Sequence, residues 1–525
     1  MPVPAVVLPP SPFATIAPEV KLVAAFSRPF DNAIATARTC YSGKGIVTED
    51  DVAKNPEQRD RIAASTYQAG HHTILQHAHF QFSLANVSRQ FLWSFLHAHP
   101  FYNSEQVSQR YVEVKAGSFA VPALPQPALG IFEAAMRHQE MAYRRLIEQL
   151  TAPAAREYYR IFPARKKDVR FEKDVKKKAQ EIARYVLPVS TTAYLYHTVS
   201  ALTLFRYHRM AAQHDAPSET AYVVARMVEE VLRHEPNFAK IMEEPLALEG
   251  SLEAKLFAAR PPGVGPARAF VEEFDRDLAG LTSKLIDWKA RGEEALADAV
   301  REVLGVPRAA MTDDDALAAA LDPAVNPYLG EAMTLTTLSK VSRVMVHASY
   351  TFKKRLSHTA DSQDQRHRMT PGSRPVLIAH LTGEPDYVTP VLLAHAAPAK
   401  ATYDDAMART WEAVERLRRL GVADEWCAYL LPNAVTVRFS ESADLLHLHH
   451  KLKARLCYNA QEEIWKASVD EARQIRDVHP RIARWLLPPC GIRLRAKTRP
   501  ICPEGDKYCG VPVWKIGIDQ YSRVI

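Results

Sequence analysis

The residues best suited to chemistry gather in one stretch of the sequence, residues 70–111. This stretch holds six histidines, with arginines, a glutamate, serines and a tyrosine near its ends. Together these groups can hold a phosphate, orient a heterocycle or move a proton. The apolar run between them, at 79–96, is too short and too polar to span a membrane. We therefore expect the apolar run to lie in a core, with a site at its polar ends.

A metal centre is one interpretation of these histidines. Strand alternation would place His77 and His79 on one face, and imidazole is a common ligand of zinc and iron. His71, His97 and His99 could add further ligands. No His-Glu-x-x-His motif and no facing pair of carboxylates accompanies them. We predict no metal here; ordinary surface or core histidines are the plainer alternative.

Composition narrows the class of protein. The chain has 525 residues and a formal charge of +7 at pH 7, with a pI near 8.9. A mildly basic balance suits phosphorylated small molecules and does not require nucleic acid. Six cysteines in this length fit reduced thiols better than a disulfide framework. No segment reaches the roughly 20 apolar residues of a membrane helix, so we expect a cytoplasmic protein with neither membrane nor nucleic-acid partners.

The sequence contains an internal duplication. Lys21 and Lys284 open similar segments and lie 263 residues apart, and Arg38 and Arg301 show the same separation. Further echoes link 104–111 with 360–367, and 183–194 with 427–438. We also aligned Ser88-Arg89 with Ser342-Arg343, which implies about ten residues lost from the second copy. Agreement at near-constant spacing indicates two copies of one unit.

Helical periodicity dominates each copy, and residues 79–88 alternate as a strand does. The sequence therefore predicts an α+β fold, in which each copy is a sheet packed with helices. The predicted organisation is an extended lead-in at 1–19, a first copy at 20–245, a linker at 246–282, a second copy at 283–490 and a C-terminal arm at 491–525.

The order of motifs resembles the flavin-dependent thymidylate synthases. The motifs are Gly-His-x-Thr-x-x-x-His from Gly70, Ser-Arg at 88–89, Glu-Gln-x-Ser-x-Arg-Tyr from Glu105, and Ala-Arg-x-Val-Leu-Pro from Ala183. The resemblance covers about 20–490 as two tandem, divergent units. It implies reductive methylation of dUMP to dTMP, with methylenetetrahydrofolate and NADPH as co-substrates and FAD as cofactor. Family members build sites between four subunits, so a tandem chain would need only to form a homodimer.

The resemblance assigns roles to several residues of the first copy. Glu105, Gln106, Ser108 and Arg110 match the nucleotide-binding stretch, with Val107 as one extra residue. Arg184 matches the phosphate-contacting arginine, and His71 and Thr73 match flavin-contacting positions. We take Ser108 as a catalytic candidate as well.

The first copy also departs from the family pattern. The family holds its flavin with Arg-His-Arg, where this copy has His97-Ala98-His99. Histidine has a pKa near 6.5 and is mostly neutral at pH 7, so two fixed positive charges are lost. Ala211 replaces the arginine that polarises the uracil ring, and Asp215 replaces a histidine.

The second copy diverges in other places. It lacks the Gly-His-x-Thr motif, and our alignment puts Asp364 and His367 at the nucleotide-binding serine and tyrosine. Arg455 falls on the ring-polarising position and is our second catalytic candidate. Lys353, Lys354 and Arg355 are predicted to replace the flavin-binding Arg-His-Arg, and Arg438 to bind substrate.

These complementary losses suggest one hybrid site. It would combine Glu105, Ser108 and Arg110 with Lys353, Arg355 and Arg455. The reciprocal set, which pairs Asp364 and Arg366 with His97, His99 and Arg184, would be weak or inactive. Two alternatives stay open: a decayed nucleotide- or flavin-binding paralogue, and a different flavin- or folate-linked nucleotide modification.

The C-terminal arm raises a separate possibility. Cys490, Cys502 and Cys509 could bind structural zinc with a histidine as fourth ligand. The six residues between Cys502 and Cys509 are not a usual zinc-knuckle spacing, so reduced free thiols are the prediction.

Overall fold

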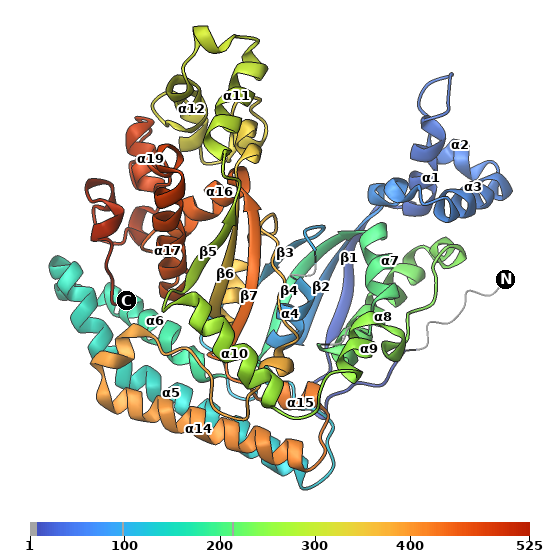
Figure 1. Cartoon of the computed structure of the whole chain (residues 1–525). Helices are drawn as coiled ribbons and strands as arrows, with labels where there is room; N and C mark the ends of the chain where they lie inside the picture. Colours follow the sequence, from blue (N-terminus) through green and yellow to red (C-terminus); the bar gives the residue numbers. More distant parts are fainter. Residues whose placement is uncertain (1–7, 97–98, 213–214) are drawn as a thin grey trace. The chain divides into compact units, whose positions relative to one another are not determined.

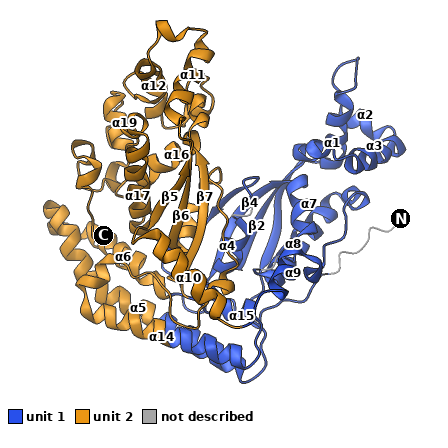
Figure 2. Ribbon diagram, in the orientation of Figure 1, with its two compact units in different colours: residues 1–140, 187–262, 409–431 blue, residues 141–186, 263–408, 432–525 orange. Residues whose placement is uncertain are grey.

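The computed structural model describes residues 8–96, 99–212 and 215–525. The chain forms two compact units, and each contains segments from both halves of the sequence (Figure 2). Unit 1 comprises Met1–Glu140, Leu187–Pro262 and Arg409–Leu431. Unit 2 comprises Met141–Val186, Gly263–Ala408 and Pro432–Ile525. Each copy of the repeat therefore lends a segment to the unit built mainly from the other copy.

Unit 1 is built on a four-stranded antiparallel sheet with the order β1-β2-β4-β3. Side chains of β2 alternate as the sequence predicts, and Phe80, Phe82 and Leu84 are buried. They join a core shared with helices of the same unit. The strands are β1 (Glu19–Ala25), β2 (His79–Ser88), β3 (Asn103–Gln106) and β4 (Thr192–Ser200).

Helices cover the sheet of unit 1 (Figure 1). Three of them begin with proline at the first helical turn, where the missing N–H costs no hydrogen bond. The helices of unit 1 are α1 (Pro29–Thr39), α2 (Glu49–Ala53), α3 (Pro56–Gln68), α4 (Arg89–Leu96), α7 (Ala201–Arg209), α8 (Pro217–His234), α9 (Leu252–Ala258) and α15 (Asp424–Ala428).

Unit 2 is built on a three-stranded antiparallel sheet, β5-β6-β7, with strands Ser283–Trp288, Ser349–Ser357 and Thr436–Asp444. The predicted linker contains α9 and α10, so it is largely helical. The helices of unit 2 are α6 (Glu172–Ala183), α10 (Gly265–Leu278), α11 (Gly292–Leu304), α12 (Asp313–Leu321), α13 (His358–Asp364), α16 (Leu445–Arg455), α17 (Glu462–Val478), α18 (Pro480–Ala483) and α19 (Pro489–Arg495). Two long helices, α5 (Ala128–Ile161) and α14 (Ala397–Arg419), run from one unit into the other along the chain.

The order of elements repeats along the chain. In each half a strand and helices lead to a short 3-10 helix, a second strand and helix, a long helix, and a last strand with two helices. Thus β2 corresponds to β6, β4 to β7, and α8 to α17. The predicted α+β fold, with two sheet-and-helix units, is confirmed.

The structure corrects one part of our alignment. Ser88 ends β2 and Ser357 ends β6, and both serines bind a glutamate on equivalent helices, Glu219 and Glu463. Ser342 instead begins the 3-10 helix Ser342–His347, the counterpart of His72–His77. The recurring Ser-Arg dipeptide misled the alignment, because its second occurrence lies one element earlier.

The two glutamates organise matching buried clusters. In unit 1, Glu219 accepts hydrogen bonds from the main-chain N–H of Ser88 at 2.7 Å, from its hydroxyl, and from the hydroxyl of Tyr429. In unit 2, Glu463 accepts from the N–H and hydroxyl of Ser357 and from Tyr185 at 2.8 Å. Each glutamate thus takes its tyrosine from the other half of the sequence. The exchanged segments are bound into each unit by buried polar contacts.

We expect Glu219 to make stability depend on pH. Burial raises the pKa of Glu219 from its ordinary value of 4.5 to about 7. The folded state therefore holds the proton more tightly than the unfolded state, so this stabilisation is full below about pH 4.5 and is lost as pH rises to about 7. Relative to Glu219→Gln, the wild type should lose at most about 1.4 kcal/mol of unfolding free energy per pH unit in that window.

Denaturant unfolding between pH 4.5 and 7.5 measures this difference. Glu253→Gln, at an exposed position of α9, is the matched control and should track the wild type at every pH. A constant difference between wild type and Glu219→Gln across the window would contradict the expectation.

Candidate functional site

The predicted nucleotide-binding residues of the first copy share one edge of the unit 1 sheet. Glu105 lies on β3 opposite Tyr196 of β4 and is exposed. Arg89 shapes the loop that follows, since its guanidinium donates to Gln106 Oε1 at 3.0 Å and to the carbonyl of Val107 at 2.8 Å. The carbonyl of the extra residue Val107 therefore accepts one of the hydrogen bonds that hold the loop against Arg89.

Ser108 and Arg110 follow in the same loop. The main-chain N–H of Arg110 donates to Ser108 Oγ at 3.2 Å. The Arg110 guanidinium lies 5.4 Å from the ring centroid of Tyr111. The structure therefore brings Glu105, Ser108 and Arg110 together on one short segment. Their role as nucleotide ligands stays a prediction.

His71 and Thr73 lie where the chain turns from α3 into the 3-10 helix His72–His77. Gly70 makes this turn with φ of +77°, a conformation that residues with a Cβ rarely adopt. Both side chains are exposed. Their position leaves them accessible to a ligand.

The structure describes His99 from the first copy's counterpart of Arg-His-Arg, and this residue takes part in internal packing. His97 and Ala98 lie outside the described residues. His99 Nδ1 accepts from the main-chain N–H of Phe101 at 3.0 Å, so the neutral ring carries its proton on Nε2, which lies 2.8 Å from Tyr207 Oη. His99 is thus committed to an aromatic cluster with Tyr102 and Tyr207.

The structure does not support the predicted flavin-binding role of residues 353–355. These residues lie within β6. Lys354 is completely buried, and its ammonium lies 2.6 Å from Asp364 and 3.0 Å from Glu471. Lys353 pairs with Asp277, and Arg355 lies 3.4 Å from Asp386. Their assignment to the Arg-His-Arg position followed from the shifted alignment.

Arg438 also has an internal role. Its guanidinium binds Asp275 through two nitrogens, at 2.8 and 2.7 Å, and pairs with Asp386 at 2.5 Å. The residue is 2% exposed. Two carboxylates neutralise one guanidinium here, so we do not retain Arg438 as a substrate ligand.

The second copy's counterpart of the family's Arg-His-Arg lies outside the set of residues predicted from the sequence. His97 follows Ser88 by nine residues, and Arg366 follows Ser357 by the same number. The tripeptide at that position is Arg366-His367-Arg368, which matches the Arg-His-Arg of the family pattern. Residues 360–367 therefore do not correspond to 104–111, and our placement of Asp364 and His367 at the nucleotide-binding serine and tyrosine was wrong. The signal is present in the sequence, and only the wrong placement of Ser342 hid it.

Arg455 lies beside this tripeptide in unit 2. Its Nε donates to His367 Nε2 at 2.9 Å, and its Nη2 donates to the carbonyl of Gln363 at 2.7 Å. Burial and the positive charge of Arg455 hold the pKa of His367 well below its ordinary value. His367 is therefore a neutral acceptor that fixes the orientation of the Arg455 guanidinium. The structure thus brings together Arg455 and the residues of the tripeptide.

A buried ionic cluster lies next to this site. The ammonium groups of Lys354 and Lys451 contact Asp364 at 2.6 and 3.0 Å, and both also bind Glu441. Burial alone would raise the pKa of Asp364, but the two ammonium groups hold it well below its ordinary value. Glu471 completes the cluster. Asp364 lies three residues before His367, so the cluster supports the segment that carries the tripeptide.

Arg184 lies in unit 2, at the end of α6, and is 3% exposed. Its Nε donates to the carbonyl of Glu181 at 3.2 Å, and its own carbonyl accepts from Asn433 at 3.0 Å. Its contact with a phosphate stays a prediction.

Among the helices that the structure describes, none is long and apolar enough to cross a membrane.

Comparison with known proteins matches both halves of the chain to one family. The family model described as thymidylate synthase complementing protein matches residues 21–237 and again 285–481. The flavin-dependent thymidylate synthase of Clostridium tetani is 27% identical over 231 residues, covering 43% of this chain and 87% of the relative. That of Geobacter sulfurreducens is 30% identical over 190 residues, covering 35% and 77%.

Among solved structures, a UMP/dUMP methylase from Streptomyces cacaoi bound with 5-Br dUMP is similar at 20% identity and a TM-score of 0.30. The match covers 43% of this chain and 95% of the methylase. The family match, made twice along one chain, covers most of the sequence. This protein belongs to the thymidylate synthase complementing protein family, as a tandem arrangement of two divergent copies.

Proposed function

We propose that this protein methylates dUMP reductively to dTMP, using methylenetetrahydrofolate, NADPH and FAD. One observation carries the proposal: Arg366-His367-Arg368 and Arg455 lie together in unit 2, with Arg455 bonded to His367. Curated relatives named flavin-dependent thymidylate synthases support it. The second copy thereby retains the two features that the first copy has lost.

The residues present fit a flavin dinucleotide. FAD carries a diphosphate, and Arg366 and Arg368 place two permanent cations on one accessible segment. When bound, the flavin would supply the hydride that reduces the transferred one-carbon unit. The arginines would hold and orient it. His71 and Thr73 are proposed as further flavin contacts.

The nucleotide is proposed to bind through Glu105, Gln106, Ser108 and Arg110, with Arg184 as a phosphate ligand. Arg455 would act on the pyrimidine ring. Its guanidinium is held by His367 and by the Gln363 carbonyl, so it can donate to a ring carbonyl oxygen without reorganising. Such donation favours electron density at C5, which then attacks the one-carbon unit. Ser108 would orient the nucleotide, and no protein nucleophile is needed.

We expect Arg366→Ala/Arg368→Ala to weaken FAD binding by about 100-fold or more, because each of the two lost charge-assisted contacts contributes roughly 1.5–3 kcal/mol. Quenching of flavin fluorescence on titration with protein measures the dissociation constant. Arg291→Ala, at an exposed arginine of unit 2, is the matched control and should bind FAD as the wild type does.

The outcomes separate the alternative functions. Unchanged FAD affinity in the double variant would refute the assignment of the tripeptide. A wild-type protein that binds dUMP but no flavin would be a nucleotide-binding paralogue. Flavin binding without dTMP formation would favour a different flavin- or folate-linked modification of a pyrimidine nucleotide.

We further propose that two chains associate as a homodimer, which light scattering of the purified protein would test.

A further inference from the structure

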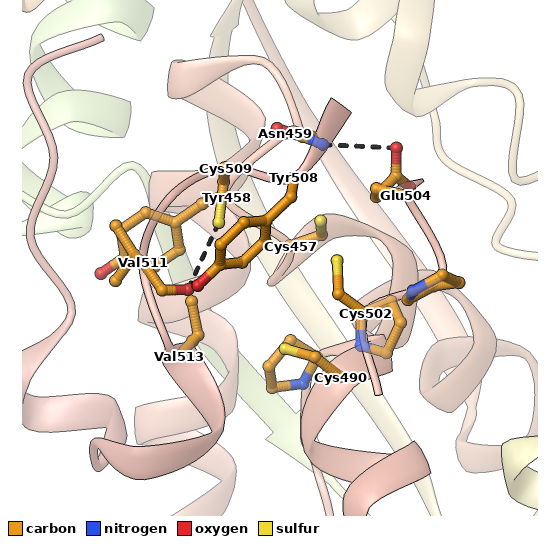
Figure 3. A pocket seen from close by; sticks show the side chains of 13 residues that line it. Cys457, Tyr458, Asn459, Cys490, Cys502, Glu504, Tyr508, Cys509, Val511 and Val513 are labelled. Carbon is orange, nitrogen blue, oxygen red and sulfur yellow. Dashed lines mark hydrogen bonds between the residues drawn. The ribbon is translucent and has the colours of Figure 1, made fainter. Parts of the chain in front are cut away.

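Four of the chain's six cysteines line one pocket of unit 2 (Figure 3). Cys457 follows α16, Cys490 is the second residue of α19, and Cys502 and Cys509 belong to the C-terminal arm. The sequence places Cys490 directly before the arm that carries Cys502 and Cys509. Cys457 lies more than 30 residues upstream in another motif, so only the fold brings it to the others.

Hydrogen bonds of one side chain connect two of the segments that line the pocket. Asn459 Nδ2 donates to Glu504 Oε2 at 3.3 Å and to the carbonyl of Lys507 at 2.6 Å. This amide thereby ties the turn that carries Cys457 to the loop that carries Cys502 and Cys509. The Asn459 side chain thus holds two distant segments of the chain on the two sides of the pocket.

One of the four sulfurs has a hydrogen bond within its own turn. Cys509 Sγ donates to the carbonyl of Val511, two residues along the chain, at 3.5 Å (Figure 3). The Cys509 side chain therefore lies against the main chain of this turn.

Gly510 makes the turn between Cys509 and Val511 possible. Its φ is +81°, and a Cβ at this position would lie 2.5 Å from Ile161 and 2.6 Å from Phe162. A side chain would therefore be excluded by both backbone conformation and space. The tight Cys509-Gly510-Val511 turn is a required feature of the arm.

The four sulfurs lie apart from one another around the pocket. Among the described residues, no three donor groups stand at ligand spacing around one point, and the four cysteines form no disulfide. Rotation about χ1 moves a cysteine sulfur between staggered positions without any change in the backbone. A metal site in this pocket would require rotations of this kind to bring the four sulfurs to one point.

We infer that this pocket is a structural zinc site with Cys457, Cys490, Cys502 and Cys509 as its ligands. Four sulfurs suit tetrahedral Zn²⁺, and a closed site without a water ligand is typical of structural zinc. Each thiol releases one proton as its Zn–S bond forms, and no sulfur is oxidised.

The site would fasten the C-terminal arm to unit 2. In the arm, the described regular structure after α19 is limited to short 3-10 turns at Gly505–Lys507, Val513–Lys515 and Ile518–Gln520. Val513 and Tyr521 of the arm join the unit 2 core. A zinc ion bound to Cys502 and Cys509 on one side and to Cys457 on the other would cross-link arm and core directly.

Metal analysis of the full-length protein tests this inference. The protein is produced with zinc in the medium, dialysed against metal-free buffer under reducing conditions, and measured by inductively coupled plasma mass spectrometry. We expect one zinc per chain in the wild type, and less than a tenth of that in Cys502→Ser/Cys509→Ser. Cys427→Ser removes a buried cysteine of unit 1 and should keep the full zinc content.

Cobalt substitution gives a second measurement that does not depend on folding of a variant. Wild-type protein loaded with Co²⁺ should show strong sulfur-to-cobalt charge-transfer absorption and the visible bands of a tetrahedral site. Wild-type protein without stoichiometric zinc, or with two disulfides among these four cysteines by peptide mass spectrometry, would overturn the inference. Neither measurement depends on catalytic activity.

Discussion

Arg455→Ala is expected to lower kcat for dTMP formation by about 100-fold or more, since removal of one preorganised transition-state donor has an effect of this size. The contacts of Arg455 with His367 and with Gln363 fix its orientation before substrate binds. Substrate affinity should change less than kcat, because the interaction strengthens as charge develops on the ring. Initial-rate measurement of dTMP with varied dUMP separates the two constants.

Arg419→Ala is the matched control for this variant. Arg419 is an exposed arginine at the end of α14, and its removal should leave turnover unchanged. Equal kcat in Arg455→Ala and wild type would show that Arg455 does not act on the ring. Circular dichroism of both variants checks that the fold is retained.

Lys354→Met is expected to destabilise unit 2 by about 3–5 kcal/mol, the usual effect of removing one partner from a buried ion pair. Lys354 contacts Asp364, Glu441 and Glu471, all of them buried. The variant would leave these carboxylates with Lys451 as the remaining ammonium group among the described contacts of the cluster. Thermal and denaturant unfolding of the full chain measure the loss.

Lys466→Met, at an exposed position of α17, supplies the comparison and should change stability by less than about 0.5 kcal/mol. A similarly small change in Lys354→Met would mean that the cluster is not a coupled unit. A second expectation distinguishes the variants: because Asp364 precedes the tripeptide in the chain, Lys354→Met should also weaken FAD binding.

The general architecture could be predicted from local sequence patterns. The alternation of apolar residues along 79–88 predicted β2. The equal separation of Lys21 from Lys284 and of Arg38 from Arg301 indicated the duplication. Both signals depend on neighbours in the sequence or on a fixed offset. The exchange of Tyr185 and Tyr429 between the two halves of the sequence could not be predicted, because the hydrogen bonds to Glu463 and Glu219 join residues more than 200 positions apart.

The site was predicted only in part. Arg455 was identified because the helix that carries it keeps a constant offset from the first copy. The tripeptide Arg366-His367-Arg368 lay outside the prediction because Ser342, and not Ser357, was taken as the counterpart of Ser88. We assigned a flavin-binding role to three consecutive basic residues, Lys353, Lys354 and Arg355. Strand geometry sends successive side chains to opposite faces, which is why such a run cannot form one cationic surface.

The most direct test of the proposed function is the amount of dTMP formed from dUMP by the purified protein with methylenetetrahydrofolate, NADPH and added FAD. We predict that dTMP formation by the wild type requires FAD and falls to background in Arg366→Ala/Arg368→Ala. The absence of dTMP from wild-type protein that has bound flavin, or equal turnover in the double variant, would contradict the proposed function.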